Sequence, residues 1–210
     1  MINRLIISFV LTFVSFSLAS AQVNITAENI FIQERTPGSH VYTHVLDGFV
    51  QTNVYKRLGL FDSYWTQPPS FGGTAYAENY VGPSLQLTKA LQVGAGIGAE
   101  HYLGVTGLRY AFYGAYSKGR LNMALTYENG KKSGRWHMGF AKWAITKKEN
   151  LGVRAQAFMG SGPFIETNRL GHGLTLWGGV LAEGVRHTGT SPNLNPMFGL
   201  YWSGTIPFKR

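Results

Sequence analysis

The stretch MFGLYWSGTIPF, residues 197–208, alternates between two kinds of side chain. One set is large and apolar, and the other is small or mildly polar. The first set is Phe198, Leu200, Trp202, Ile206 and Phe208, interrupted only by Gly204, and the second is Gly199, Tyr201, Ser203, Thr205 and Pro207. Because successive side chains of a β-strand point to opposite faces, this pattern predicts a strand with one apolar face.

The same alternation recurs along most of the chain from Thr74 onward. Val93 and Ile97, for example, oppose Gly94 and Gly96. Glycines in a row on one face would leave holes in a soluble core, but they make room for bulky side chains inside a narrow barrel. Strands are predicted around residues 74–87, 91–102, 105–117, 121–128, 136–140, 153–159 and 174–183, and 160–169 is either a loop or a short strand.

Single-chain barrels have even numbers of strands, so about eight to ten strands are expected. Residues 22–48 alternate poorly and are predicted to be an irregular N-terminal segment. The barrel domain is then expected to cover residues 49–210. Composition agrees with an all-β chain, because aromatic residues make up 14%, charged residues only 14%, and there are 27 glycines.

Charged and aromatic side chains are placed as a membrane-facing barrel requires. The cations gather at strand ends and turns, where a charge near the bilayer interface costs about 0–1 kcal/mol, against roughly 2–4 kcal/mol at the midplane. Aromatic residues that could form interfacial girdles near strand ends are Trp65, Trp136, Trp202, Tyr110, Tyr127, Phe198 and Phe208. Trp136, Met138 and Phe140 are expected on the apolar face of their strand.

These patterns together resemble the small outer-membrane β-barrels of Gram-negative bacteria, whose closing strand alternates and ends on an aromatic residue. Here Lys209 and Arg210 follow Phe208. The resemblance is to the class and rests on no family motif. It implies an antiparallel up-and-down transmembrane β-barrel in the cell outer membrane.

The first residues have the features of an export signal. Arg4 precedes an apolar run from Leu5 to Leu18, and Ala19-Ser20-Ala21 follows. Such a pattern predicts a cleavable signal peptide over residues 1–21. The chain has no cysteine, so an exported product would be held by its core and strand ladder without disulfides.

The formal net charge of +9 bears on partners. An exported protein rarely meets nucleic acid, so the positive charge predicts contact with membrane lipids, including lipopolysaccharide, and no nucleic-acid partner. The oligomeric state stays open. No cofactor is expected.

Six charged residues fall on the predicted inner face and are the candidate binding residues of the lumen: Glu78, Glu100, Arg109, Glu128, Arg154 and Glu183. Carboxylate–guanidinium pairs in a narrow lumen are the simpler interpretation, since buried charges need partners. A substrate or proton-transfer site is the alternative. The histidines show no metal-ligand pattern, because His40 and His44 have helical spacing in a region that does not read as helix.

The function expected from these features is a structural, adhesive or narrow-pore role in the outer membrane. A lipid A- or lipopolysaccharide-modifying enzyme is the first alternative. The chain lacks the His-x-Ser pair of the lipid A deacylases, since His187 is followed by Thr188 and Gly189. A secreted, soluble lipocalin-like barrel is the second alternative.

Overall fold

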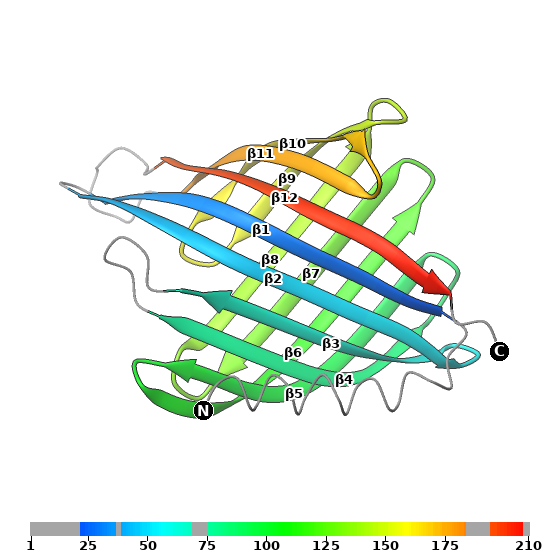
Figure 1. Ribbon diagram of the computed structural model, residues 1–210, viewed down its shortest axis with the longest axis horizontal. Coiled ribbons are helices and arrows are strands. Elements are labelled where there is room, and N and C mark those ends of the chain that lie inside the picture. Colours follow the sequence, from blue (N-terminus) through cyan, green and yellow to red (C-terminus); the bar gives the residue numbers. More distant parts are fainter. Residues whose placement is uncertain (1–21, 37–38, 69–74, 184–193, 208–210) are drawn as a thin grey trace.

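The chain forms one closed antiparallel barrel in which every strand pairs with its neighbours in sequence (Figure 1). The computed structural model describes residues 22–36, 39–68, 75–183 and 194–207. Its strands are β1 (Gln22–Thr36), β2 (Ser39–Tyr55), β3 (Leu58–Gln67), β4 (Tyr76–Gln86), β5 (Leu91–Tyr102), β6 (Val105–Lys118), β7 (Leu121–Gly130), β8 (Gly134–Ala144), β9 (Glu149–Gln156), β10 (Gly160–Gly171), β11 (Leu174–Ala182) and β12 (Leu194–Pro207).

The barrel closes between its first and last strands. β1 pairs with β12 from Gln22–Pro207 through Ile32–Met197. On the outer side of this seam, Phe31 stacks on Phe198 with ring centroids 4.9 Å apart. Closure removes the free sheet edge that would otherwise template aggregation, and Figure 1 shows the strands running obliquely around the barrel.

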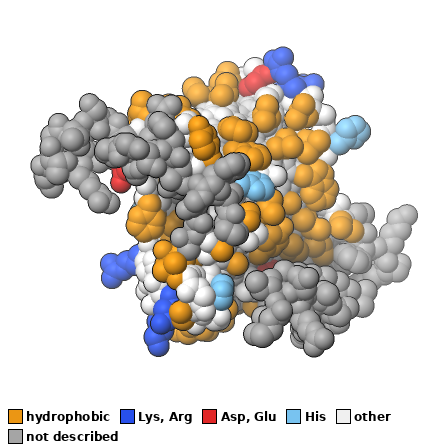
Figure 2. All heavy atoms as spheres, turned by 60° about the vertical axis from the view of Figure 1, so that its left-hand side comes forward, with side chains coloured by type: hydrophobic (Ala, Val, Ile, Leu, Met, Phe, Trp, Pro, Cys, Tyr) orange, Lys and Arg blue, Asp and Glu red, His pale blue; other side chains and the backbone are white. Residues whose placement is uncertain are grey.

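Alternation sorts the side chains into an outer apolar face and a lumen. In β12, Phe198 and Leu200 are exposed on the outside at 55% and 41%, whereas Met197 is buried inside. The outer faces of β6, β7 and β9 likewise expose Phe112, Leu125 and Val153. Figure 2 shows hydrophobic side chains gathered over a broad part of the visible surface, with Lys and Arg at its margins. The predicted alternation of residues 197–207 is therefore confirmed.

The predicted fold class is confirmed, but the strand count is twelve instead of eight to ten. Two of the additional strands, β1 and β2, occupy the segment expected to be irregular, so the barrel begins at Gln22 and not at Phe49. These strands point apolar side chains inward as well as outward. Ile30 and Val45, for instance, are fully buried inside, and this hides the period-two pattern. The ambiguous segment 160–169 lies in β10.

β8 faces opposite to expectation. Trp136 pairs with Glu128 of β7, and Met138 pairs with Gln156 of β9. Both partners face the lumen. The apolar face of β8 therefore points inward. Trp65 also points inward, since it pairs with Glu78. Neither tryptophan belongs to an interfacial girdle.

The two rims of the barrel differ in the length of their connections. At one rim, here called the turn end, lie residues 22 and 207 and the connections 56–57, 87–90, 119–120, 145–148 and 172–173. At the other, the loop end, lie the connections 37–38, 68–75, 103–104, 131–133, 157–159 and 183–193. No helix among the described residues is long and apolar enough to cross a membrane. Residues 1–21 lie outside the described part of the chain, and the signal peptide stays a prediction.

Candidate functional site

Four of the six predicted lumen charges meet at the loop end of the barrel. Glu78, Glu100, Arg109 and Glu128 come from the adjacent strands β4, β5, β6 and β7 and are here called the ionic cluster. Arg109 Nη1 lies 3.0 Å from Glu100 Oε2, Nη2 lies 2.5 Å from Glu128 Oε2, and Nε pairs with Glu78. The side chains are 0–4% exposed. One guanidinium therefore holds three desolvated carboxylates.

Hydroxyl and backbone donors complete the ionic cluster. The Tyr80 hydroxyl donates to Glu128 Oε1 at 2.6 Å, and the Tyr76 hydroxyl donates to Glu78 Oε2 at 2.5 Å. Glu100 accepts from the Lys132 backbone N–H at 2.6 Å and from the Ser133 hydroxyl. A buried carboxylate that is saturated with donors is stable but poorly placed to accept a substrate proton. The ionic cluster therefore fits the structural interpretation.

Arg154 lies apart from the ionic cluster, on β9. Its guanidinium carbon is 4.5 Å from the centre of the Trp177 ring, and Nη2 is 3.5 Å from Gln156 Oε1. The Trp177 indole N–H donates to Glu28. Glu28 and Asp47 pair with each other across the β1–β2 ladder on the lumen face. Glu183 is half-buried one residue beyond β11, at the loop end.

Among the described side chains, four charged residues of the lumen were not predicted: Glu28, Asp47, Lys142 and Glu166. Lys142 Nζ lies 2.6 Å from Glu166 Oε1, which also accepts from Asn150 at 2.7 Å. Glu28, Asp47 and Glu166 lie on strands that the sequence did not predict securely. The inward orientation of Lys142 could have been predicted from the sequence. Lys142 follows Phe140 by two residues and so shares its face of β8, and a lysine there favours a face that points into the lumen and not into lipid.

Aromatic side chains from distant strands meet inside the lumen at the loop end. β3 and β8 are separated by four intervening strands, yet the rings of Trp65 and Trp136 meet with centroids 5.5 Å apart. This contact is here called the tryptophan bridge. Trp65 also packs against a buried apolar cluster of Ile30, Ile32, Val45, Met159, Trp177, Leu181 and Met197.

A second aromatic group crosses the lumen nearer the turn end. Phe49 of β2 meets Tyr113 of β6 edge to face, with centroids 5.4 Å apart. Phe61 lies 4.8 Å from Tyr113 and is fully buried. Such groups fill much of the space that twelve strands enclose.

Polarity and exposure change along the lumen. At the turn end the inward-facing side chains include polar residues that are partly or fully exposed, namely Asn24, Gln51, Gln92, Asn122, Asn150 and Ser203. At the loop end the inward-facing ionic and apolar clusters are buried. The lumen is thus a polar vestibule at the turn end and is packed at the loop end.

The histidines do not assemble a metal site within the described residues. His44 Nε2 lies 2.6 Å from Asn29 Oδ1 on the outer wall, and its ring stacks on Phe31. His101 Nδ1 lies 3.2 Å from the Thr106 hydroxyl. A histidine–amide pair can orient a general base, but in the described part of the chain no hydroxyl hydrogen-bonds to His44 to complete a nucleophile.

Solved structures with a similar fold include outer-membrane proteins. A KdgM porin in complex with disordered oligogalacturonate matches with a TM-score of 0.57 and 12% identity, covering 83% of this chain and 98% of that one. The outer membrane phospholipase A from Escherichia coli matches with a TM-score of 0.55 and 8% identity, covering 84% and 89%. No family model and no curated protein sequence matches. At these identities the likeness establishes the fold alone, and at that level the resemblance to outer-membrane barrels is confirmed.

Proposed function

We propose that this barrel lies in the outer membrane and acts as a narrow pore that is closed at its loop end. The observation that carries the proposal is the tryptophan bridge, in which side chains from opposite walls meet inside the lumen. The exposed apolar belt supports placement in a bilayer, where only helices and closed barrels satisfy every backbone group. The predicted signal peptide supports export.

The turn end would face the periplasm and the loop end the outside. Barrels of this class have short periplasmic turns and longer extracellular loops. The vestibule would then open inward, and the packed half would hold the pore shut from outside. This arrangement suits a pore that opens by rearrangement of the lumen plug and disfavours a wide, permanently open channel.

The described turn end is strongly basic, which would give the pore a preference for anions. Glu149 is its acidic residue, paired with Arg169. The basic residues are Lys56, Arg57, Lys89, Lys118, Arg120, Lys147, Lys148 and Arg169. Charge of one sign at a mouth raises the local concentration of the opposite ion.

Single-channel conductance in planar bilayers tests the proposal. The wild-type protein should conduct weakly, and the double variant Trp65→Ala/Trp136→Ala should conduct severalfold more, with anions preferred in a salt gradient. Trp143→Ala is the matched control, because Trp143 lies on β8 but faces outward and is 52% exposed. Equal conductance of a folded double variant and the wild type would contradict the pore, and would favour a structural or adhesive role.

A lipid-modifying enzyme is the second candidate, favoured by the His44–Asn29 pair on the membrane-facing wall. Incubation with phospholipid and with lipid A, analysed by mass spectrometry, tests this function. Turnover by the wild type that disappears in His44→Ala would support an enzymatic function. Absence of turnover by the folded wild type would exclude it.

A further inference from the structure

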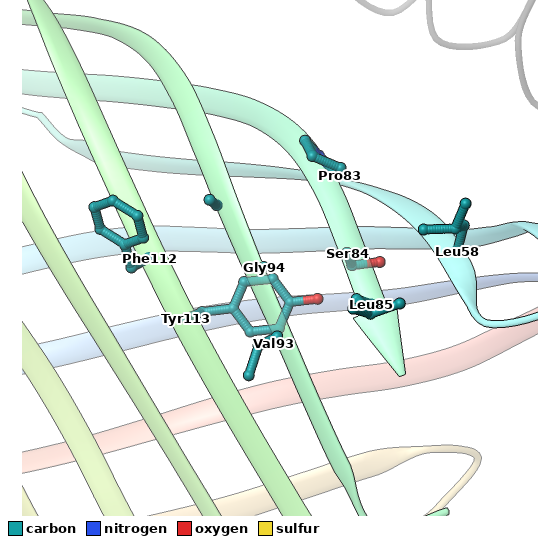
Figure 3. Close-up of a pocket in the computed structure, with 9 residues that line it drawn as sticks. Leu58, Pro83, Ser84, Leu85, Val93, Gly94, Phe112 and Tyr113 are labelled. Atoms are coloured by element: carbon teal, nitrogen blue, oxygen red, sulfur yellow. The ribbon is translucent and has the colours of Figure 1, made fainter. Parts of the chain in front are cut away.

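A groove cuts into the apolar outer wall near the turn end. It has a volume of about 450 Å³, and its membrane-facing lining includes Leu58, Leu85, Val93 and Phe112. Three other lining residues, Ser84, Gly94 and Tyr113, belong to the lumen face, and Figure 3 shows the Tyr113 hydroxyl directed toward Ser84. The groove therefore reaches from the lipid-facing surface into the thickness of the wall.

Pro83 lines the groove at a break in the β4–β5 ladder. β4 and β5 pair at Val81–Ile97 and again in the same register at Ser84–Gly94, but not in between. Proline has no N–H to donate to the ladder, and in a closed barrel no free edge can accommodate it. Small outward-facing residues leave further space on the outer wall here. Ala95 lines the groove. Gly114 has open space beside it, because a Cβ there would have no neighbour nearer than the Gln92 carbonyl oxygen at 4.0 Å.

Basic turns border the mouth of the groove. Lys56 and Arg57 immediately precede Leu58, and Lys89 lies in the turn between β4 and β5. The Gln86 N–H donates to the Arg57 carbonyl at 2.9 Å, which holds the two turns side by side. All three cations are exposed. An apolar slot with cations at its rim matches a molecule that has an acyl chain and an anionic head.

We propose that the groove binds one anionic phospholipid, with an acyl chain against Leu85, Val93 and Phe112 and the phosphate at Lys56, Arg57 and Lys89. This inference rests on the proposed membrane location but is independent of pore activity. The headgroup cations lie at the turn end, which the proposed orientation places in the inner leaflet, so the source is a glycerophospholipid and not lipopolysaccharide. The lumen-face residues in its lining distinguish the groove from the flat apolar wall that contacts bulk lipid.

Native mass spectrometry of the detergent-solubilised mature protein tests the proposal. The probes are phosphatidylglycerol, phosphatidylcholine and lipopolysaccharide, titrated separately. We expect one retained phosphatidylglycerol, bound more tightly than phosphatidylcholine. Each cation near an anionic surface is worth about fivefold in affinity, so Lys56→Gln/Arg57→Gln/Lys89→Gln should weaken phosphatidylglycerol at least about tenfold and leave phosphatidylcholine unchanged.

The groove itself is tested with Ala95→Leu, which adds an apolar side chain to its lining and should weaken both phospholipids. Matched controls are Ala155→Leu on the exposed outer face of β9 and Lys131→Gln/Lys147→Gln/Lys148→Gln on turns away from the groove. Folding of each variant is checked by heat-modifiable gel mobility. The site would be overturned if the two phospholipids bound equally and neither the cation variant nor Ala95→Leu changed their binding. The choice of lipid would be overturned if lipopolysaccharide bound more tightly through the same cations. Conductance is measured on the same samples, so failure of the pore and failure of the lipid site are distinguishable.

Discussion

Removal of Arg109 should destabilise the barrel more than almost any other single substitution. The guanidinium is 2% exposed and contacts three carboxylates that are at most 4% exposed. Breaking one buried ion pair by removing a partner costs about 3–5 kcal/mol, because the remaining charge stays desolvated. Arg109→Met leaves three such groups facing one another, so the loss should reach or exceed about 5 kcal/mol.

The assay is equilibrium urea unfolding in micelles, followed by tryptophan fluorescence and by the folded fraction on unboiled gels. The quadruple variant Arg109→Met/Glu78→Gln/Glu100→Gln/Glu128→Gln removes every charge of the ionic cluster and should recover most of the loss. Arg120→Met, in an exposed turn, should stay within about 0.5 kcal/mol of the wild type. An Arg109→Met protein with nearly wild-type stability would refute the view that the ionic cluster is dry and that Arg109 holds it together.

Two further predictions concern the wall. Gly82→Val should abolish the folded band on unboiled gels, because a Cβ at this position would lie 1.9 Å from the Ala95 carbonyl oxygen. Gly114→Ala should fold normally, because the nearest neighbour of its Cβ would be 4.0 Å away. Normal folding of both variants would contradict the close approach of β4 and β5. Leu125→Arg, on the outer face in the middle of β7, should cost about 2–4 kcal/mol in lipid, and Leu121→Arg at the turn end about 0–1 kcal/mol; equal urea midpoints for the two would argue against a membrane-spanning β7.

The sequence predicted the strands whose two faces differ in chemistry. β5 opposes valine, alanine and isoleucine to glycine, and β12 opposes large apolar residues to small ones, so period two was plain in both. The inward orientation of Glu78, Glu100, Arg109 and Glu128 followed from the same alternation. Their convergence on one guanidinium did not, because it depends on the stagger between four strands.

The first two strands and β8 show where such reasoning fails. Alternation marks the lumen only where the lumen is polar, and the part of this lumen that β1, β2 and β8 line is largely apolar. Ile30 and Val45 are buried inside the barrel while Phe31 and Leu46 are exposed outside it, so β1 and β2 present apolar residues on both faces. β8 shows the same effect, because its apolar residues Trp136 and Phe140 face the lumen. The tryptophan bridge joins two segments far apart in sequence, and no local pattern announces it.

Gel mobility of the mature protein, unboiled and boiled, after refolding with and without detergent micelles, tests the central claim most directly. A closed membrane barrel predicts a compact, faster-migrating band that forms only with micelles and shifts on boiling. A protein that is monodisperse and folded in the absence of detergent would contradict it, and a soluble lipocalin-like barrel would then be the better description.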